Sequence, residues 1–429
     1  MRSRLLIRFV LPMIAAVAMC SFANRDRLRG WLQPDLVVSG SMAPALLGPH
    51  YRQACEQCKF SMVSGADLTD VNQDFVCQNC GRRQAWRPGI SPKPGTRTWI
   101  DTRAPRRRWQ VYAYRNANDD LEIKRLVGLP GERITFAEGD VLANGKRLQK
   151  NVRQLRQVAI VVHESGGGTE GFGSGAMTTP TNLHRWHSGP SDDQRIGWSP
   201  IPRGWAYRGD RDEAESTALT YHHFLSYESP WPRDTPAAIQ DDHGYNANLS
   251  RRLHAVDDVG IECDLELAPS ARLECVLATR AGDVFVEVVR RGPLGSRISI
   301  RHENESRSWR IYSEHGPKRL LLGICDRRVL WAYGGDSGAM SVNWTPHRKW
   351  LSEPLRLRAR GRSAVLMNLR IWRDVYYYRP AHVSPSQRLS AAHWLFLGDN
   401  VPVSIDGRFV PEGILGRRIL GQVNVWSEP

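Results

Sequence analysis

Hydrophobic and polar positions divide the chain into one uncharged apolar run near the N-terminus and many short segments that alternate. The run extends from Phe9 to Ala23 and follows three arginines among the first eight residues. It is short for a helix that crosses a bilayer, which needs about 20 residues, but Leu5–Ile7 extend it and a flanking arginine can snorkel. We therefore expect residues 1–30 to form an uncleaved membrane anchor, with a cleaved signal peptide as the alternative.

Alternation with a period of two predicts β-strands in the part of the chain before residue 150. The segment Leu36–Val38 reads as a strand that leads into a serine-rich turn, and Trp109–Tyr114 and Glu122–Val127 read as two more. We expect a hairpin at Asn144–Gly145, because this dipeptide favours the two-residue turn that joins antiparallel strands. These segments predict a β-rich core.

A second series of short strands occupies about residues 255–380, within a longer region, 151–390, that separates the first strands from the C-terminal segment. Apolar or alternating segments between turn residues include 261–267, 273–277, 284–288, 297–300, 309–312, 320–322, 329–333, 355–357 and 366–372. The pattern predicts a β-sandwich and resembles a concanavalin-type jelly roll. Cys263 and Cys275 are expected in its core, with a disulfide between them as the alternative. No ligand set is visible, so a binding role and a purely structural role both stay open.

The net charge is +15 and comes almost entirely from arginine, because only seven of the 59 basic residues are lysines. Such a charge favours either nucleic acid or anionic lipid headgroups as a partner. The basic residues are spread along the chain without a dense block, which favours a generally arginine-rich composition over a nucleic-acid patch. We expect membrane lipid, and no nucleic acid, among the partners.

Four cysteines form two pairs, Cys55-x2-Cys58 and Cys77-x2-Cys80, separated by 18 residues. This is the spacing of two zinc knuckles. We expect residues 49–105 to be a zinc-ribbon-like insert, in which a structural zinc replaces a core that so short a segment cannot build. Disulfides are the alternative, because an oxidising compartment would favour them.

The candidate chemistry begins with the sequence SGSMAP, Ser39–Pro44, a short way beyond the apolar run. A serine is a weak nucleophile until a neighbouring base takes its proton. His50 and His393 lie near candidate segments, but neither has a motif around it. Lys124 lies among apolar residues, and burial there would favour the neutral amine that a base needs.

Three stretches together resemble the sequence boxes of type I signal peptidases, which are membrane-bound Ser-Lys proteases. They are SGSMAP, IKRLVGLPGE around Lys124, and LGDN at 397–400 together with the residues up to Arg408. The resemblance covers about residues 1–48, 108–150 and 390–425. It implies a catalytic core of the signal-peptidase type.

The resemblance implies roles for three residues of the first two boxes. Ser41 is the nucleophile and Lys124 is the general base. The hydroxyl of Ser39 and the backbone N–H of Ser41 are the donors that stabilise the oxyanion. Ala45 departs from the family, which often has threonine at this position.

The resemblance also implies supporting roles in the C-terminal segment. Ser404 is expected to hydrogen-bond the amine of the catalytic lysine and orient it. Asp406 and Arg408 are expected to form an ion pair that braces the loop, although Gly407 replaces the usual serine between them. Asp399 is expected to support the site, with an ordinary turn aspartate as the alternative.

The expected protein is mainly β, with an anchor, a catalytic core (31–48, 106–150 and 391–429), a zinc-ribbon-like insert and a β-sandwich insert. The resemblance implies a single-pass enzyme of the inner membrane that removes signal peptides from preproteins on the extracytoplasmic side, without a catalytic cofactor. The strand pattern of the second insert predicts that catalysis needs no residue from it. Two alternatives remain: a self-cleaving repressor of the related Ser-Lys class, and a non-catalytic membrane-anchored adhesion or assembly protein.

Overall fold

The computed structural model describes residues 32–165, 185–189, 196–209, 218–225, 236–292, 295–312 and 317–425. Strands make up most of the regular structure in these ranges, so the predicted mainly β class is confirmed. No helix in these ranges is both long enough and apolar enough to span a bilayer. The anchor predicted at residues 1–30 lies outside the described residues.

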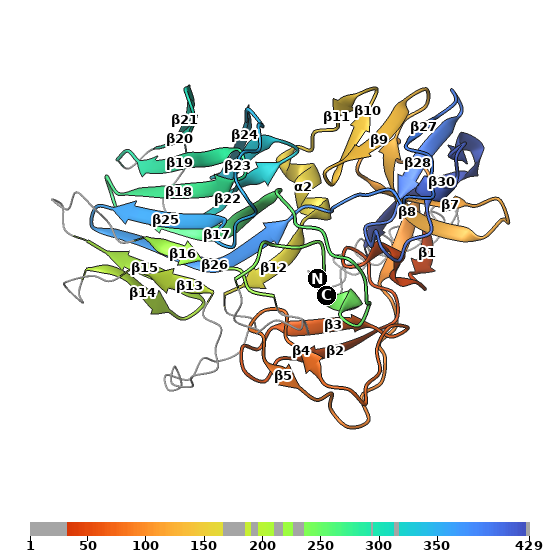
Figure 1. The fold of residues 1–429 in the computed structure, drawn as a ribbon, viewed down its shortest axis with the longest axis horizontal. Helices are drawn as coiled ribbons and strands as arrows, with labels where there is room; N and C mark the ends of the chain where they lie inside the picture. The colour runs from red at the N-terminus through yellow and green to blue at the C-terminus, as the bar shows by residue number, and fades with distance from the viewer. Residues whose placement is uncertain are drawn as a thin grey trace, which may run out of the picture.

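Seven antiparallel strands form the main sheet, at the right of Figure 1. Their order is β1, β6, β30, β7, β8, β28 and β29, with bounds Leu32–Leu36, Arg97–Asp101, Ile419–Val425, Val111–Arg115, Leu121–Gly128, His393–Leu397 and Ile414–Leu415. The two strands predicted after residue 106 correspond to β7 and β8, whereas the strand predicted at Leu36–Val38 ends at Leu36. The last strand, β30, lies between β6 and β7, so the sheet joins segments from both ends of the described chain.

A four-stranded sheet has the order β11, β10, β9 and β27, with bounds Lys146–Arg147, Asp140–Ala143, Arg133–Ala137 and Ser386–Arg388. Asn144 and Gly145 have φ angles of 51° and 77° in the turn between β10 and β11. Positive φ at both positions is what the two-residue hairpin turn requires, so the predicted hairpin is confirmed. Because β27 pairs with β9, the boundary predicted at 390 is wrong, and the core resumes by Ser386.

The cysteine-bearing insert consists of two short hairpins below the main sheet in Figure 1. They pair β2 (His50–Ala54) with β3 (Ser61–Gly65), and β4 (Phe75–Val76) with β5 (Arg83–Gln84). A bridge between His50 and Lys93 closes this insert, which we call the cysteine module. The boundary predicted at 105 is wrong, because β6 already belongs to the main sheet, where it pairs with β1 and β30.

Two large sheets face each other at the left of Figure 1 and enclose the largest apolar core. One has the order β14, β15, β26, β17, β22, β23 and β24, with β12 beside β26; the bounds are Gly197–Ile201, Gly204–Arg208, Ser363–Arg373, Val259–Leu267, Lys318–Cys325, Arg328–Tyr333, Asp336–Ser341 and, for β12, Ile160–Glu164. The other has the order β13, β16, β25, β18, β19, β20 and β21, with bounds Trp186–Ser188, Leu219–Tyr221, Leu355–Arg360, Arg272–Thr279, Gly282–Arg290, Ser296–His302 and Glu305–Ile311.

This architecture confirms the predicted β-sandwich, but the sandwich begins earlier in the chain than predicted. It starts at β12, not near residue 255, because β12 and β15 pair with β26, and β16 pairs with β25, much later in the chain. Such distant pairing leaves little local signal in the sequence. Cys263 and Cys275 lie in the core as free thiols, with exposed fractions of 1% and 0%.

A short helix, α2 (Val152–Val158), connects the four-stranded sheet to the sandwich. Asn151 caps it by accepting a hydrogen bond from the Gln154 backbone, and the Gln154 side chain returns the contact. Just before it, the Lys150 ammonium donates to Asp326 of the sandwich at 2.7 Å and lies 2.8 Å from Asp374. The joint between core and sandwich is therefore held by buried charges.

Residues 236–258, drawn in green in Figure 1, leave the sandwich and form a crossing segment. This segment runs toward the cysteine module and toward the turn that carries Ser41, which we call the serine turn. Within this crossing segment, Gly244–Asn246 forms the 3-10 helix η2, and the Tyr245 hydroxyl donates to the Pro49 carbonyl at 3.2 Å. The Tyr245 ring packs so closely on Gly40 that an added Cβ would lie 2.5 Å from it. The insert therefore contacts the serine turn, and that catalysis needs no residue from the insert stays a prediction.

Candidate active site

The serine turn is a single turn of 3-10 helix, η1 (Gly40–Met42), at the edge of the main sheet. Met42 anchors it by packing into the apolar cluster of the sheet, beside Ile100 and Ala113. Asn400 holds it from the other side, because its backbone N–H donates to the Ser41 carbonyl at 3.1 Å and its side chain donates to the Gly40 carbonyl at 2.8 Å. The Ser41 hydroxyl is therefore presented by a turn fixed at several points.

Lys124 of β8 meets this turn directly. Its Nζ donates to Ser41 Oγ at 3.0 Å, although the two residues are 83 positions apart. Both residues are enclosed, with exposed fractions of 9% for Ser41 and 5% for Lys124. The structure thus places the predicted nucleophile and base within hydrogen-bond reach, the geometry that activation of a serine requires.

The surroundings of Lys124 favour its neutral form. Desolvation by burial lowers the pKa of this lysine, and the nearby carboxylates of Glu122 and Asp406 oppose the shift without reversing it. The closer of the two, Glu122, has its Oε2 at 3.8 Å from the amine and also accepts hydrogen bonds from Tyr114 and Asn116. A depressed pKa is what a lysine needs to accept a proton at working pH.

The predicted oxyanion donors lie beside the nucleophile. The hydroxyl of Ser39 is 3.2 Å from that of Ser41 and belongs to an exposed residue. Ser41 is the second residue of η1, so its backbone N–H has no acceptor within the helix. A hydroxyl and a free N–H at the same turn can together stabilise a negatively charged oxygen.

The predicted contact between Ser404 and Lys124 is not formed. Ser404 is buried, and its Oγ has no hydrogen-bond partner among the described residues. Gly398 packs directly against it, since a Cβ added to Gly398 would lie 2.1 Å from this oxygen and 2.6 Å from the Ser41 carbonyl. Ser404 therefore lies next to the serine turn, but the lysine takes its orientation from Ser41 and Glu122.

The predicted ion pair of Asp406 and Arg408 is present and fully enclosed, with Nε to Oδ1 at 2.8 Å. Arg408 also donates to the Val401 and Ser404 carbonyls, so it ties the loop together. Gly407, within the 3-10 helix η3 (Gly407–Phe409), has no space for a side chain, because a Cβ there would lie 2.4 Å from Leu395. The departure from the family's serine therefore fits a tightly packed loop.

Asp399 is not an ordinary turn aspartate. Its carboxylate pairs with the guanidinium of Arg125 through two hydrogen bonds, one of them 2.7 Å from Nε to Oδ1, and both side chains are almost completely buried. Tyr377 adds a longer contact of 3.4 Å. Because successive side chains of a strand point to opposite faces, β8 presents Lys124 to the serine turn and Arg125 to Asp399.

Two polar residues of the site were missed by sequence reasoning. Arg125 was missed because it carries no motif beyond the lysine box, although a second basic residue directly before Leu126 and Val127 signals a buried partner. Asn246 of the crossing segment exchanges side-chain hydrogen bonds with Asn400, at 2.5 Å and 3.0 Å. Nothing in the local sequence around Asn246 indicates this contact, because it joins positions 154 residues apart.

The histidines remain outside this arrangement. The His50 ring contacts the Gly48 carbonyl at 2.8 Å, and the His393 ring contacts the Ser390 hydroxyl at 2.5 Å. Neither ring has a hydrogen bond to Ser41 among the described contacts. A Ser-His arrangement is therefore not formed by these residues.

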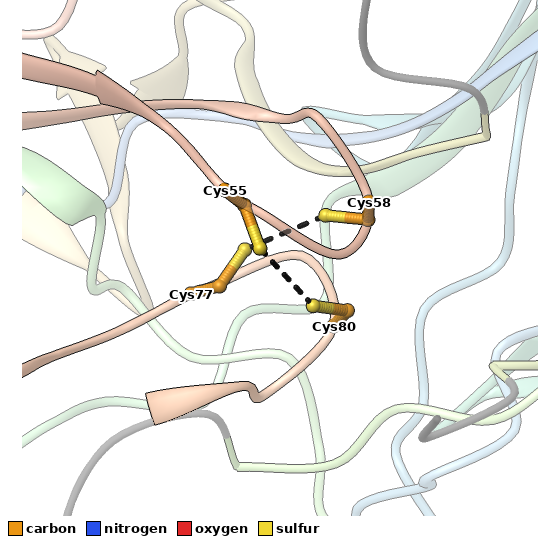
Figure 2. Close-up of side chains that lie close together, drawn as sticks. All are labelled: Cys55, Cys58, Cys77 and Cys80. Atoms are coloured by element: carbon orange, nitrogen blue, oxygen red, sulfur yellow. Dashed lines mark hydrogen bonds between the residues drawn. The ribbon is translucent and has the colours of Figure 1, made fainter. Parts of the chain in front are cut away.

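The four paired cysteines converge, as Figure 2 shows. All four sulfurs lie within 4.8 Å of one another as free thiols, with Cys55 to Cys80 at 3.7 Å and Cys58 to Cys77 at 3.6 Å. A tetrahedral zinc with Zn–S bonds of about 2.3 Å needs sulfurs about 3.8 Å apart, whereas a disulfide bond is only about 2.05 Å long. The donor set and its spacing fit a zinc ion.

The cysteine module is bonded to its surroundings next to this cluster. The Asn79 side chain donates to the Glu164 carbonyl of β12 and accepts from its N–H, both at 2.9 Å. The same amide donates to Cys58 Sγ at 3.7 Å. Arg185 adds hydrogen bonds to the Asn79 and Gln78 carbonyls. The knuckle that carries Cys77 and Cys80 is therefore attached to the sandwich.

Comparison with known proteins identifies no family. No family model and no curated protein matches the chain. Among solved structures, carbohydrate-binding module CBM66 from Bacillus subtilis is 10% identical, with a TM-score of 0.25 over 44% of this chain and 94% of that one. A Crh5 transglycosylase in complex with NAG is 9% identical, with a TM-score of 0.29 over 57% of this chain and 90% of that one. Trypanosoma rangeli sialidase is 12% identical, with a TM-score of 0.25 over 42% and 27%.

Proposed function

We propose that the chain is a membrane-bound serine endopeptidase that removes N-terminal signal peptides from exported proteins, with its catalytic part on the extracytoplasmic side of the inner membrane. The observation that carries this proposal is the contact of 3.0 Å between Lys124 Nζ and Ser41 Oγ, both buried. The resemblance of three sequence boxes to type I signal peptidases supplies the reaction class. No cofactor takes part in this chemistry.

The residues support a two-step reaction. Neutral Lys124 accepts the Ser41 proton as Oγ attacks the scissile carbonyl, and the Ser39 hydroxyl with the Ser41 N–H stabilises the oxyanion. The lysine then delivers its proton to the leaving amine, and an acyl-enzyme on Ser41 remains. The same amine activates a water that hydrolyses the ester and restores the serine.

The surface beside the serine supports an apolar peptide as substrate. Val38 and Ile405 each adjoin a site serine in the sequence, and their exposed fractions are 77% and 79%. Exposed apolar side chains next to a reactive group favour binding of an apolar segment. Signal peptides carry such a segment before the cleavage site.

The test is cleavage of a purified preprotein by the purified full-length chain in detergent. Wild-type protein should release the signal peptide, and Ser41→Ala should not. Ser61→Ala, at an exposed serine of the cysteine module, is the matched control and should cleave normally. A folded wild-type chain that leaves the preprotein intact would favour the non-catalytic adhesion or assembly role.

We also propose that Cys55, Cys58, Cys77 and Cys80 hold one structural zinc. The convergence of four free thiols at zinc-like spacing supports this. Metal analysis of the purified protein should find about one zinc per chain, and Cys58→Ser should lower the zinc content and the thermal midpoint together. Absence of metal with all four thiols oxidised would decide for disulfides.

A further inference from the structure

The outer face of the seven-stranded sandwich sheet carries arginines in register. Arg360 of β25 lies opposite Arg272 of β18, and Arg297 of β20 lies opposite Arg310 of β21. Val289 of β19 lies between the two pairs, opposite both Arg272 and Arg297. These five residues form one row across five adjacent strands. Their neighbours along the strands point into the sandwich core, so the row faces away from it.

Two further rows follow on the same face. The middle row contains Arg358, Glu274, Glu287, Ser299 and Ser308, and the third contains Arg356, Val276, Phe285, Arg301 and Ser306. We call the three rows together the arginine face. It contains seven arginines, Arg272, Arg297, Arg301, Arg310, Arg356, Arg358 and Arg360.

Carboxylates neutralise only part of this charge. Glu287 lies 3.6 Å from Arg272 and 3.5 Å from Arg297, Glu274 lies 3.8 Å from Arg358, and Asp283 pairs with Arg356 at 2.9 Å. Within the part of the chain that the structure describes, Arg301, Arg310 and Arg360 have no ion pair. Arg301 instead lies over the Phe285 ring at 4.1 Å.

The arrangement is not one that sheet stability would select. Like charges directly opposite each other destabilise an antiparallel sheet, and the pairs Arg360–Arg272 and Arg297–Arg310 are of this kind. Exposed ion pairs such as those of Glu274 and Glu287 contribute little to the free energy of unfolding. An excess of positive charge that costs stability therefore indicates an anionic ligand.

We propose that the arginine face binds an acidic polysaccharide, independently of the Ser41–Lys124 site. Guanidinium forks pair well with carboxylate and sulfate groups, and strands about 4.8 Å apart offer them at regular intervals to a polymer with repeating charges. The middle row supplies what the sugar hydroxyls need, because Glu274 and Glu287 accept hydrogen bonds and Ser299 and Ser308 both donate and accept them.

Two other polyanions fit less well. A nucleic acid would bring phosphates against the carboxylates of the middle row, and Arg301 covers the Phe285 ring on which a base would stack. A lipid surface favours exposed large apolar side chains, and none of the exposed ones in the described ranges falls on the three rows. The ligand that matches both charge and hydroxyl chemistry is a charged carbohydrate chain.

The test is binding of the full-length chain in detergent to polygalacturonate at about 0.1 M salt, with neutral dextran as the reference polymer. The wild type should bind polygalacturonate and not dextran. Arg310→Gln with Arg360→Gln should weaken binding at least about tenfold, because two charge-assisted contacts are lost. Arg301→Gln is a second variant, for use if the double variant is poorly folded.

The control is Arg87→Gln with Arg153→Gln, which removes the same charge at exposed positions outside the face. It should bind normally, and all variants should keep wild-type peptidase activity. If the control variant weakened polygalacturonate binding equally, the effect would come from net charge alone, and the proposal would be overturned. Tighter binding of duplex DNA or anionic vesicles than of polygalacturonate, lost in the same face variants, would replace the polysaccharide by that ligand.

Discussion

Two lysines of this chain are buried to nearly the same extent, yet their pKa values shift in opposite directions. Lys124, next to Ser41, is 5% exposed, and Lys150, at the joint with the sandwich, is 3% exposed. Desolvation would lower the pKa of both. At Lys150 the carboxylates of Asp374 and Asp326 outweigh desolvation and raise the pKa well above its ordinary value. At Lys124 desolvation prevails and the pKa is lowered.

The difference lies in what touches the amine. Lys150 Nζ has carboxylate oxygens at 2.7 Å and 2.8 Å, and it lies 4.4 Å from the centre of the Trp109 ring. Lys124 Nζ has a hydroxyl at 3.0 Å and a carboxylate only at 3.8 Å. Burial alone therefore does not make a base. A buried lysine can act as a base where no carboxylate contacts its amine directly. Where carboxylates do contact the amine, the lysine stays charged and has a structural role.

The largest expected effect is on catalysis. Lys124→Arg keeps the charge but cannot release a proton, so it should lower the rate of preprotein cleavage by at least about 10³-fold, as Ser41→Ala should. The double variant should be no worse than either single one, because the two residues act as a unit. Lys146→Arg, on the exposed hairpin, is the control. A Lys124→Arg enzyme that retains a tenth of the wild-type rate would refute the dyad.

The next effect should separate the two lysines by stability. Lys150→Met leaves two carboxylates buried without their cation, and should lower the free energy of unfolding by about 3–5 kcal/mol. Lys124→Met removes a buried amine whose nearest carboxylate, that of Glu122, is 3.8 Å away, so it should be nearly neutral or stabilising. Denaturant unfolding followed by tryptophan fluorescence measures both. Equal losses for the two variants would contradict the comparison.

A smaller effect concerns pH at the Lys150 joint. Burial, with the neighbouring Asp326 and Asp374, raises the pKa of Asp258 from 3.8 to about 8. Between these two values the folded chain holds a proton that the unfolded chain releases, so this group makes the free energy of unfolding fall as pH rises from about 4 to 8. Asp258→Asn should flatten that decline in thermal midpoints across the window. An unchanged slope would show that another group causes it.

The smallest effect is a shift of the pH–rate profile. The Glu122 carboxylate raises the pKa of Lys124, against the stronger effect of desolvation. Glu122→Gln should therefore lower that pKa further and move the acidic limb of the profile to lower pH, with little change in the plateau rate. The measurement is preprotein cleavage across a pH series. A shift to higher pH would mean that Glu122 is not the charge that opposes desolvation.

The sequence predicted the parts of this molecule whose signals are local. Alternation located β7 and β8, Asn144–Gly145 located a hairpin, and two CxxC pairs located the convergent thiols. The contact between Ser41 and Lys124 was expected only because of the family resemblance. It could not be derived from alternation, since 83 residues separate the two.

What the sequence missed depends on partners far along the chain. The prediction placed β6 in the cysteine insert and β27 in the inserted region 151–390, because the strands that pair with them, β30 and β9, lie hundreds of residues away. The amide pair of Asn246 and Asn400 is of the same kind, since neither residue carries a motif that names the other. The Ser404–Lys124 contact was wrong because the family pattern gives residue types and spacing, and not side-chain orientation.

The position of β30 has a consequence for how this protein comes into being on the ribosome. Because β30 fills the space between β6 and β7, a nascent chain that has not yet reached Ile419 has a gap in the sheet that supports Lys124. The entire sandwich is synthesised before that gap can close, and such non-local pairing closes late and slowly. A nascent copy therefore completes the main sheet only after β30 has emerged, and premature termination upstream of Ile419 yields a protein whose main sheet lacks this strand.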